Sequence, residues 1–299
     1  MILIFTKDYI QFWLSLVLQE KIVVWKIQEL RNSATLVLNI NDEFILKSFF
    51  SEDKKEKSRF RKETRNQKLI SGFFCTPEVL HIDKLNDIII YRYIKPKLSH
   101  GLILEDKVLI FFRIQQSLGK LNPSSFKKNY PPQLFSKSYF IQKLSTDLAL
   151  SISKWKKKYV HETCVHGDLK SDNIIILSEN DYYVIDWENA GIGDEVFELS
   201  YFVSSLILYD TDNFEILDFT GRSDLVNFIT HNPEYKVVFK NIYLRNTKKF
   251  RKFLAFLSIS IIWRIVIDNE YQINQIKDNF YFKLSTDLLS AINRNERII

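Results

Sequence analysis

The sequence predicts an α+β fold with two lobes, because strand patterns dominate its first third and helix patterns dominate the rest. The first lobe, residues 1–95, is expected to hold a small antiparallel sheet with one helix. The second lobe, residues 96–299, is expected to be mostly helical. With 299 residues, of which 46% are apolar, the chain is long enough to bury a sizeable core.

The elements of the first lobe follow from apolar runs and turn residues. A short amphipathic helix is expected within the first 20 residues. Asn41-Asp42 is a hairpin signal between two strand-like runs. The charged stretch 51–72 predicts a helix with Ser51 as its N-cap and Gly72 at its end. Strands are predicted at 21–30, 34–40, 43–50, 77–83 and 87–94.

The second lobe begins after Pro96, where the patterns become helical. Two short apolar runs, 173–177 and 182–186, interrupt the helices and favour a hairpin, because only four residues separate them. Helices are predicted at about 102–118, at about 133–160 and from about 195 to the end.

Composition excludes several classes of protein. Two cysteines, Cys75 and Cys164, are too few for a disulfide framework, which favours a reducing cytoplasm. Lys7 interrupts the apolar N-terminus, so no signal peptide is expected. The apolar run 253–267 is too short for a membrane span. We interpret the net charge of +6 as a solvated surface, so we expect a cytoplasmic protein with no nucleic-acid partner.

The stretch "HGDLKSDN" concentrates polar groups directly before a predicted buried strand. A hairpin of the two short strands would place Asn173 and Asp186 side by side at its open end, with Asp168 on the loop before it. Carboxylate and amide oxygens are ligands that suit Mg²⁺. A further carboxylate can accept a hydroxyl proton. The spacing therefore predicts a magnesium site next to a general base.

Further residues at fixed spacing extend this pattern. In chain order the set is His166, Gly167, Asp168, Asn173, Asp186, Gly193, Asp194, Glu198 and Leu199. The set resembles the aminoglycoside phosphotransferase and choline kinase branch of the protein-kinase-like fold, whose pattern is H-G-D-L-x-x-x-N followed by I-D-W/F-E. The chain departs from this family at Glu198, where Asp is usual.

The resemblance implies an ATP- and Mg²⁺-dependent phosphotransferase that acts on a hydroxyl of a small molecule, such as a sugar, an aminoglycoside or a choline-like metabolite. It assigns Asp168 to the acceptor hydroxyl proton, and Asn173 and Asp186 to the metal. Lys170 is a candidate catalytic residue that would reach the γ-phosphate, with an exposed loop lysine as the alternative. His166 is expected to brace the loop by hydrogen bonding.

The first lobe offers a cation for the nucleotide phosphates. Lys47 lies in an apolar strand, where a lysine is costly unless it is paired. Glu63 on the charged helix is the favoured partner, and Glu56, about two turns earlier on the same face, is the main alternative. Glu52 is expected to face solvent. The resemblance implies that Lys47 holds the α- and β-phosphates and that Glu63 orients it.

The sequence does not fix which residues contact the adenine. By resemblance, backbone groups around Tyr91, Tyr93 and Ile94 would hydrogen-bond the adenine edge; the alternative is an ordinary buried strand. The first hairpin, which would cradle the phosphates, has no glycine, and its tip is expected at Asn32 and Ser33. Asn tolerates left-handed dihedrals, and the hydroxyl of Ser33 can bond a phosphate.

Two other functions stay open. A protein kinase is disfavoured, because no A-P-E segment or long activation loop follows Asp186. A non-catalytic pseudokinase remains an alternative because of the glycine-free hairpin. The acceptor would bind to helices of the second lobe, whose charge leans toward a neutral or anionic hydroxyl compound. No oligomeric state is predicted.

Overall fold

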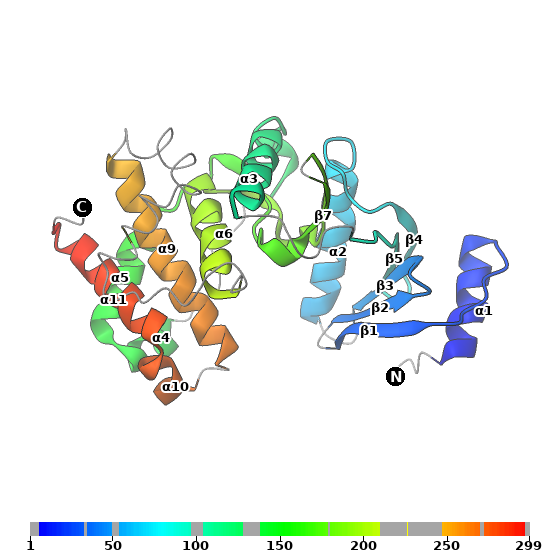
Figure 1. Ribbon diagram of the computed structural model, residues 1–299, viewed down its shortest axis with the longest axis horizontal. Coiled ribbons are helices and arrows are strands. Elements are labelled where there is room, and N and C mark those ends of the chain that lie inside the picture. The colour runs from blue at the N-terminus through cyan, green and yellow to red at the C-terminus, as the bar shows by residue number, and fades with distance from the viewer. Residues whose placement is uncertain are drawn as a thin grey trace. The chain divides into compact units, whose positions relative to one another are not determined.

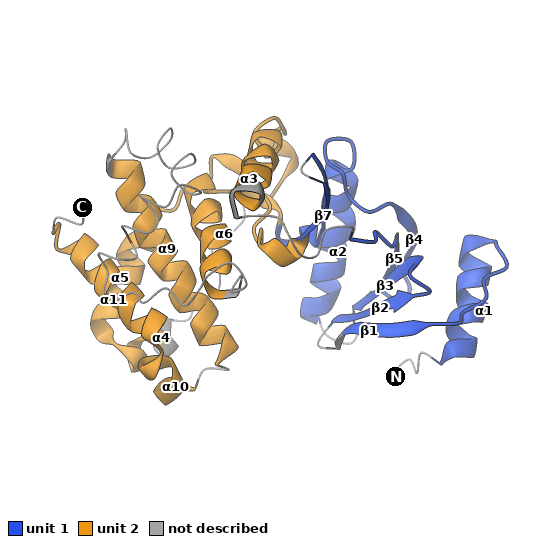
Figure 2. Cartoon of the chain, viewed as in Figure 1, with its two compact units in different colours: residues 1–99, 174–189 blue, residues 100–173, 190–299 orange. Residues whose placement is uncertain are grey.

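The computed structural model describes nine ranges of the chain: residues 6–32, 35–49, 54–96, 104–127, 138–178, 180–209, 226, 247–269 and 272–296. The chain divides into two compact units, coloured separately in Figure 2. The first comprises residues 1–99 and 174–189, and the second comprises 100–173 and 190–299. The predicted α+β class is confirmed, with an antiparallel sheet in the first unit and mostly helices in the second (Figure 1).

The first unit is built on a five-stranded antiparallel sheet with strand order β1-β2-β3-β5-β4. The later segment 174–189 adds a two-stranded hairpin and a 3₁₀ turn to this unit. Its elements are α1 (Lys7–Leu18), β1 (Ile27–Asn32), β2 (Thr35–Ile40), β3 (Phe44–Phe49), α2 (Lys54–Ile70), β4 (Val79–Asp83), β5 (Ile88–Arg92), β7 (Ile174–Ser178), β8 (Asp181–Val184) and η4 (Trp187–Asn189).

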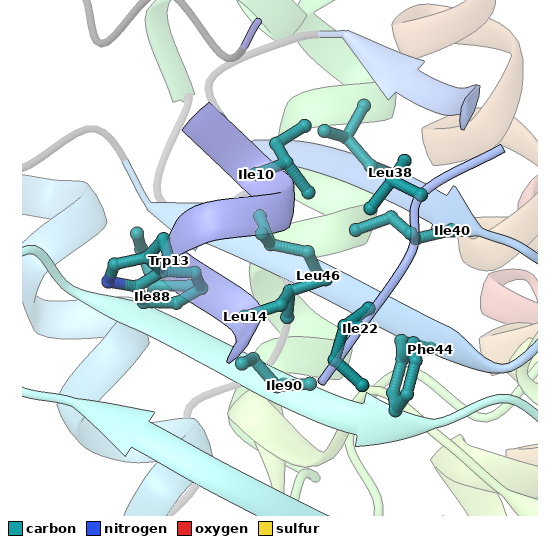
Figure 3. Close-up of a cluster of buried hydrophobic side chains, with 11 residues drawn as sticks. Ile10, Trp13, Leu14, Ile22, Leu38, Ile40, Phe44, Leu46, Ile88 and Ile90 are labelled. Atoms are coloured by element: carbon teal, nitrogen blue, oxygen red, sulfur yellow. The ribbon is translucent and has the colours of Figure 1, made fainter. Parts of the chain in front are cut away.

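One face of the sheet is covered by α1. The helix buries Ile10, Trp13 and Leu14 against strand side chains, as Figure 3 shows. Burial of a large apolar side chain contributes about 1.5–3 kcal/mol, so this contact stabilises the outer layer of the unit. The sheet residues of this cluster are Leu38, Ile40, Phe44, Leu46, Ile88 and Ile90.

The opposite face of the sheet packs on α2. Phe60 of α2 meets Phe49 of β3 edge to face, with ring centroids 5.7 Å apart. Side chains alternate along a strand, so Ile89 and Tyr91 of β5 join this second cluster while their neighbours join the first. By the same alternation, the face toward α2 also receives Lys47 of β3.

The segment predicted as a strand at 21–30 becomes a strand only from Ile27. Residues 21–26 are extended, with Ile22 and Val24 buried in alternation, but they belong to no ladder. Their N–H groups donate to side chains instead: Ile22 N–H to Ser15 Oγ (3.0 Å) and Val24 N–H to Gln11 Oε1 (2.9 Å). The pattern correctly indicates extended chain, but at Ile22 and Val24 side chains of α1 take the place of a partner strand.

The predicted turn at Asn41-Asp42 is confirmed. It joins β2 and β3, which pair in register from Thr35 with Phe49 to Ile40 with Phe44. Both turn residues have left-handed φ, 59° and 56°, which Asn and Asp tolerate better than other residues with a Cβ.

The described residues of the second unit form helices, the 3₁₀ turns η1 and η3 and a small antiparallel pair of strands. α9 contacts both α6 and α11 and is buried along most of its length. The elements are α3 (Leu104–Leu118), η1 (Pro123–Ser125), α4 (Ser138–Leu144), α5 (Thr146–Lys156), β6 (Thr163–Val165), η3 (Ser171–Asn173), β9 (Gly191–Gly193), α6 (Glu195–Tyr209), α9 (Thr247–Asp268), α10 (Ile273–Asp278) and α11 (Phe280–Asn293).

Several expected boundaries differ from the structure. The helix expected at about 133–160 is divided at Ser145, whose side chain caps α5 by accepting from Leu148 N–H. The strands β6 and β9 are absent from the sequence prediction. Ser51 lies outside the described residues. Within the described part of the chain, no helix has the length and apolar character needed to cross a membrane.

Candidate active site

The second unit holds the loop that carries Asp168. β6 ends at Val165, and His166 follows as a completely buried residue. Gly167 has φ of 82°, a conformation that a residue with a Cβ rarely adopts. The 3₁₀ turn η3 then ends at Asn173, and β7 begins at the next residue. Glycine between His166 and Asp168 therefore allows the turn that redirects the chain.

Hydrogen bonds fold this loop onto Asp168. Asn173 Nδ2 donates to the Asp168 carbonyl at 2.8 Å and lies 3.4 Å from Asp168 Oδ2. The Asp168 N–H donates to His166 Nδ1 at 3.3 Å, and the Asn173 N–H donates to the Lys170 carbonyl at 3.0 Å. The bracing expected of His166 is present. Lys170 is half-buried, and its assignment to the γ-phosphate stays a prediction.

A buried carboxylate supports the loop from α6. Glu198 Oε1 accepts from the Gly167 N–H at 2.6 Å, and Oε2 accepts from Gln115 at 2.5 Å. Burial raises the pKa of Glu198 to about 7, although the donated hydrogen bonds from Gly167 and Gln115 oppose that rise. The Glu that departs from the family pattern is thus connected directly to the loop that carries Asp168.

Asp194 anchors the start of α6. Its Oδ1 accepts from the N–H groups of Val196 (3.0 Å) and Phe197 (3.3 Å), as an N-cap does. Its Oδ2 accepts from the Val160 N–H at 3.0 Å and pairs with Lys252 at 2.6 Å. The Gly-Asp part of the motif therefore has a structural role, and it fixes the helix that presents Glu198.

The first unit brings together Lys47, Glu63 and Asp186. Lys47 Nζ lies 2.6 Å from Glu63 Oε2 and 2.8 Å from Asp186 Oδ1. Burial alone would lower the pKa of Lys47, but the charges of Glu63 and Asp186 outweigh it and raise that pKa above its ordinary value. Lys47 is therefore a fixed positive charge. The ion pair with Glu63 is present, while the nucleotide-binding role of both residues stays a prediction.

Tyr91 supports this ion pair from β5. Its buried hydroxyl donates to Glu63 Oε1 at 2.8 Å, and burial next to that carboxylate raises the pKa of Tyr91. Its side chain thus belongs to the cluster around Lys47. Tyr93 lies just beyond the strand, and its N–H donates to the Glu43 carbonyl at 2.8 Å. Ile94 follows in extended chain.

An ion network that the sequence analysis missed lies beside the Lys47 cluster. Arg59 of α2 makes a fork of two bonds to Glu188, Nε to Oε2 and Nη2 to Oε1, each 2.8 Å. The same guanidinium bonds Glu56 at 2.9 Å and Thr35 at 3.1 Å. Glu56, the alternative partner for Lys47, therefore pairs with Arg59 instead. One available signal was the spacing of Arg59, one helical turn before Glu63.

Three carboxylates of the first unit are close enough to share a cation. One oxygen each from Glu63, Asp186 and Glu188 lies within 4.8 Å of the others. Asp186 also has φ of 66°, a strained value for a residue with a Cβ. Hard oxygen donors of this kind fit Mg²⁺. Among the predicted metal ligands, Asp186 belongs to the first unit and Asn173 to the second, so their convergence stays a prediction.

The predicted tip of the first hairpin is described only in part. Ser33 lies outside the described residues, and Asn32 is the last residue of β1. In the second unit, the Tyr201 hydroxyl donates to Asp168 Oδ1 at 2.8 Å. No motif of the sequence indicates this contact, because Tyr201 is one of several aromatic residues in an apolar helix.

Comparisons with known proteins find one matching family profile and several similar folds. The profile of the phosphotransferase enzyme family matches residues 142–219, which include the loop of Asp168 and the start of α6. A structure of the GDP and kanamycin complex of APH(2")-IIia is similar over 97% of this chain and 100% of its own, with 14% identity and a TM-score of 0.58. The chain has the fold of the aminoglycoside phosphotransferases. The resemblance expected from the sequence is confirmed.

Two more aminoglycoside phosphotransferase structures extend this likeness. The GDP complex of wild-type aminoglycoside 2'-phosphotransferase-IIIa is 14% identical over 97% of this chain and 99% of its own, with a TM-score of 0.56. Aminoglycoside phosphotransferase APH(4)-Ia is 12% identical over 98% of this chain and 100% of its own, with a TM-score of 0.58. The similarity to aminoglycoside phosphotransferases thus extends over nearly the whole chain.

Proposed function

We propose that the chain is an ATP- and Mg²⁺-dependent phosphotransferase that moves the γ-phosphate to a hydroxyl of a small molecule. The observation that carries the proposal is the buried cluster in which Glu63 and Asp186 hold the ammonium of Lys47. A fixed cation of this kind suits the α- and β-phosphates of a nucleotide. The family profile and the fold likeness support the same activity.

In this proposal Lys47 binds the nucleotide phosphates and Glu63 orients it. Asn173 and Asp186 hold Mg²⁺, which when bound neutralises charge on the phosphate oxygens. Tyr91, Tyr93 and Ile94 border the adenine with backbone groups, and the hydroxyl of Ser33 contacts a phosphate.

Asp168 receives the proton of the acceptor hydroxyl as that oxygen bonds to the γ-phosphorus. The bond from the γ-phosphorus to the β–γ bridging oxygen breaks, and the nucleoside diphosphate leaves. Lys170 offsets charge on the transferred group. The hydrogen bond from Asn173 Nδ2 to the Asp168 carbonyl supports this assignment, because it holds the loop that carries the carboxylate.

The acceptor is proposed to be a sugar, an aminoglycoside, a choline-like compound or a related metabolite. APH(2")-IIia was solved with GDP and kanamycin, and a thermostable APH(4)-Ia mutant was solved with ADP and hygromycin B. The purified chain should therefore be assayed with Mg-ATP and Mg-GTP against a panel of sugars, nucleosides, choline and aminoglycosides. Acceptor-dependent release of nucleoside diphosphate is the expected result. Nucleotide binding without turnover would instead indicate a pseudokinase.

The carboxylate of Asp168 is expected to be needed for turnover. Asp168→Asn removes the proton acceptor and is expected to lower kcat by roughly 10²–10⁴-fold while nucleotide affinity stays nearly unchanged. The matched control is Asp172→Asn, because Asp172 lies on the same loop and is exposed. Steady-state kinetics with the acceptor found in the panel checks both variants. An unchanged kcat in Asp168→Asn would refute the assignment.

A further inference from the structure

The two carboxylate oxygens of Asp168 have different surroundings. Oδ1 accepts a hydrogen bond of 2.8 Å from the Tyr201 hydroxyl. Oδ2 lies 3.4 Å from Asn173 Nδ2, a distance at which a hydrogen bond is weak. A carboxylate is symmetric, so it needs an external contact to fix which oxygen faces a substrate. Tyr201 supplies such a contact on one oxygen only.

Tyr201 is itself held firmly in α6. The guanidinium of Arg264 lies over its ring, 4.0 Å from the centroid. Arg264 Nη2 also donates to the Tyr201 carbonyl at 3.1 Å, and Nε donates to Ser204 Oγ at 2.9 Å. Phe197 stacks near the same ring, with centroids 6.3 Å apart and planes 21° from parallel. The hydroxyl therefore has little freedom to move away from Asp168.

Arg264 is a buried cation whose charge is compensated in part by the ring of Tyr201. It comes from α9 and is only 5% exposed, although burial of a guanidinium is costly unless its charge is compensated. A cation over an aromatic face is a favourable contact, and it strengthens when water is excluded. Arg264 of α9 thus contacts Tyr201 of α6, and Tyr201 in turn bonds the carboxylate of Asp168.

We propose that Tyr201 is a positioning residue for Asp168 and that Arg264 fixes Tyr201 in turn. This inference rests on the proposed function. The tyrosine engages Oδ1, so that Oδ2 is the oxygen that receives the proton of the acceptor hydroxyl. A near-attack arrangement requires the reacting atoms to be held in place, and loss of one supporting contact misaligns them.

The direct test is Tyr201→Phe, which removes the hydroxyl and keeps the ring beneath Arg264. We expect kcat to fall by about 10–100-fold, because the lost hydrogen bond is one to a charged group and such bonds are stronger than those between neutral groups. The KM for Mg-ATP should stay within about twofold, because the nucleotide contacts are assigned to other residues. Tyr281→Phe on α11 of the same unit is the matched control and should keep full activity.

A second measurement separates positioning from a general loss of structure. In the Asp168→Asn background, Tyr201→Phe should change the residual rate by less than about twofold, because its effect passes through the carboxylate. The probe is release of nucleoside diphosphate from Mg-ATP, with the acceptor found in the panel and with water alone. Circular dichroism and the melting temperature of each variant verify folding.

The outcomes are distinguishable. If the wild-type chain transfers phosphate and Tyr201→Phe matches it in kcat, the positioning role is wrong and the proposed function stands. The positioning role would also be overturned if Tyr201→Phe lowered the rate by the same factor in the wild-type and Asp168→Asn backgrounds. Such a result would indicate a structural effect that does not pass through the carboxylate. A wild-type chain that turns over no nucleotide overturns the proposed function and this inference together.

Discussion

Among single residues, Lys47 is a buried charge of the first unit that two carboxylates hold. Lys47→Met removes the cation between Glu63 and Asp186 and leaves two acids without it. Breaking a buried ion pair on one side costs about 3–5 kcal/mol, so we expect a loss of that size in the free energy of unfolding. Urea denaturation measures it.

The control for this prediction is Lys26→Met. Lys26 pairs with Asp42 at 2.8 Å, but both side chains are exposed. Exposed pairs contribute little, so this variant should unfold at nearly the wild-type urea concentration. Equal stability of the two variants would contradict the role of burial in the Lys47 cluster.

Glu198 predicts a specific dependence of stability on pH. Its pKa is about 7 in the folded chain, against an ordinary value of 4.5. Between these values the folded chain keeps a proton that the unfolded chain releases. The contribution of Glu198 to stability is therefore complete below about pH 4.5, declines as the pH rises toward 7, and levels off above it, by about 3 kcal/mol in total.

Glu198→Gln should abolish this decline, because glutamine does not titrate. The measurement is urea unfolding of wild type and variant at several pH values from 5 to 8. Glu195→Gln is the control, since Glu195 lies on the same helix but is exposed. If the wild-type and Glu198→Gln curves run parallel through this window, the pKa of Glu198 is not raised.

The residues of the site differ in how clearly the sequence indicates them. Lys47 was recognisable because an isolated lysine in an apolar strand requires an acid. The spacing of Arg59 from Glu63 is a signal too weak to single it out, because α2 carries many basic residues and only the fold distinguishes the one that bonds Glu188. Tyr201 was missed for a related reason: no local pattern encodes a hydroxyl that meets a carboxylate 33 positions earlier.

At the scale of elements, the pair β6–β9 carries the loop of Asp168 and depends on Gly193. A Cβ at this position would lie 2.6 Å from Val165 Cγ2 and 2.6 Å from the Tyr159 hydroxyl. Gly193→Ala is therefore expected to destabilise the chain by about 1–3 kcal/mol, the usual cost of overpacking. Thermal or urea unfolding measures the change.

Gly72→Ala is the matched control for this substitution. No atom lies within 4 Å of the Cβ that it would add after α2. Removing a glycine from the unfolded ensemble without strain stabilises slightly or has no effect. A similar loss in both variants would mean that the crowding at β9 does not determine the result.

The boundaries of strands are predictable where two strands adjacent in sequence form a hairpin. The hairpin at Asn41-Asp42 has a local signal, and the structure contains it. The extent of β1 has no such signal, because distant side chains bond the backbone before it: residues of α1 bond Ile22 and Val24, and Asn41 bonds Trp25 and Lys26. β6 and β9 span three residues each, too few to give a period, and their pairing is set by the tertiary fold.

At the scale of the whole molecule, the first unit is discontinuous in sequence. Segment 174–189 returns to it and supplies Trp187, whose ring lies 5.1 Å from that of Phe74. Asn66 Nδ2 donates to the Trp187 carbonyl at 2.8 Å, and the Val184 N–H donates to the Cys75 carbonyl at 3.0 Å. The unit therefore needs partners from a segment that begins only at residue 174, although its first segment ends at residue 99.

This discontinuity predicts the behaviour of a fragment. Residues 1–99 alone would leave Asn66 and Arg59 without Trp187 and Glu188, and buried polar groups without partners are costly. We expect the fragment to lack the cooperative unfolding transition of the full chain, as measured by circular dichroism in urea. A sharp transition in the fragment would show that segment 174–189 is dispensable for folding.

The late return of segment 174–189 also constrains the order of events during synthesis. Ribosomes add about 5–20 residues per second, so several seconds pass between completion of β5 and emergence of β8. Throughout that interval α2 and Phe74 lack Trp187, which later bonds Asn66 and packs against the ring of Phe74. Codon choice upstream of residue 189, and chaperone supply while that part of the chain is synthesised, should therefore influence the yield of folded protein in heterologous expression. Codon changes downstream of residue 189 should influence this yield less.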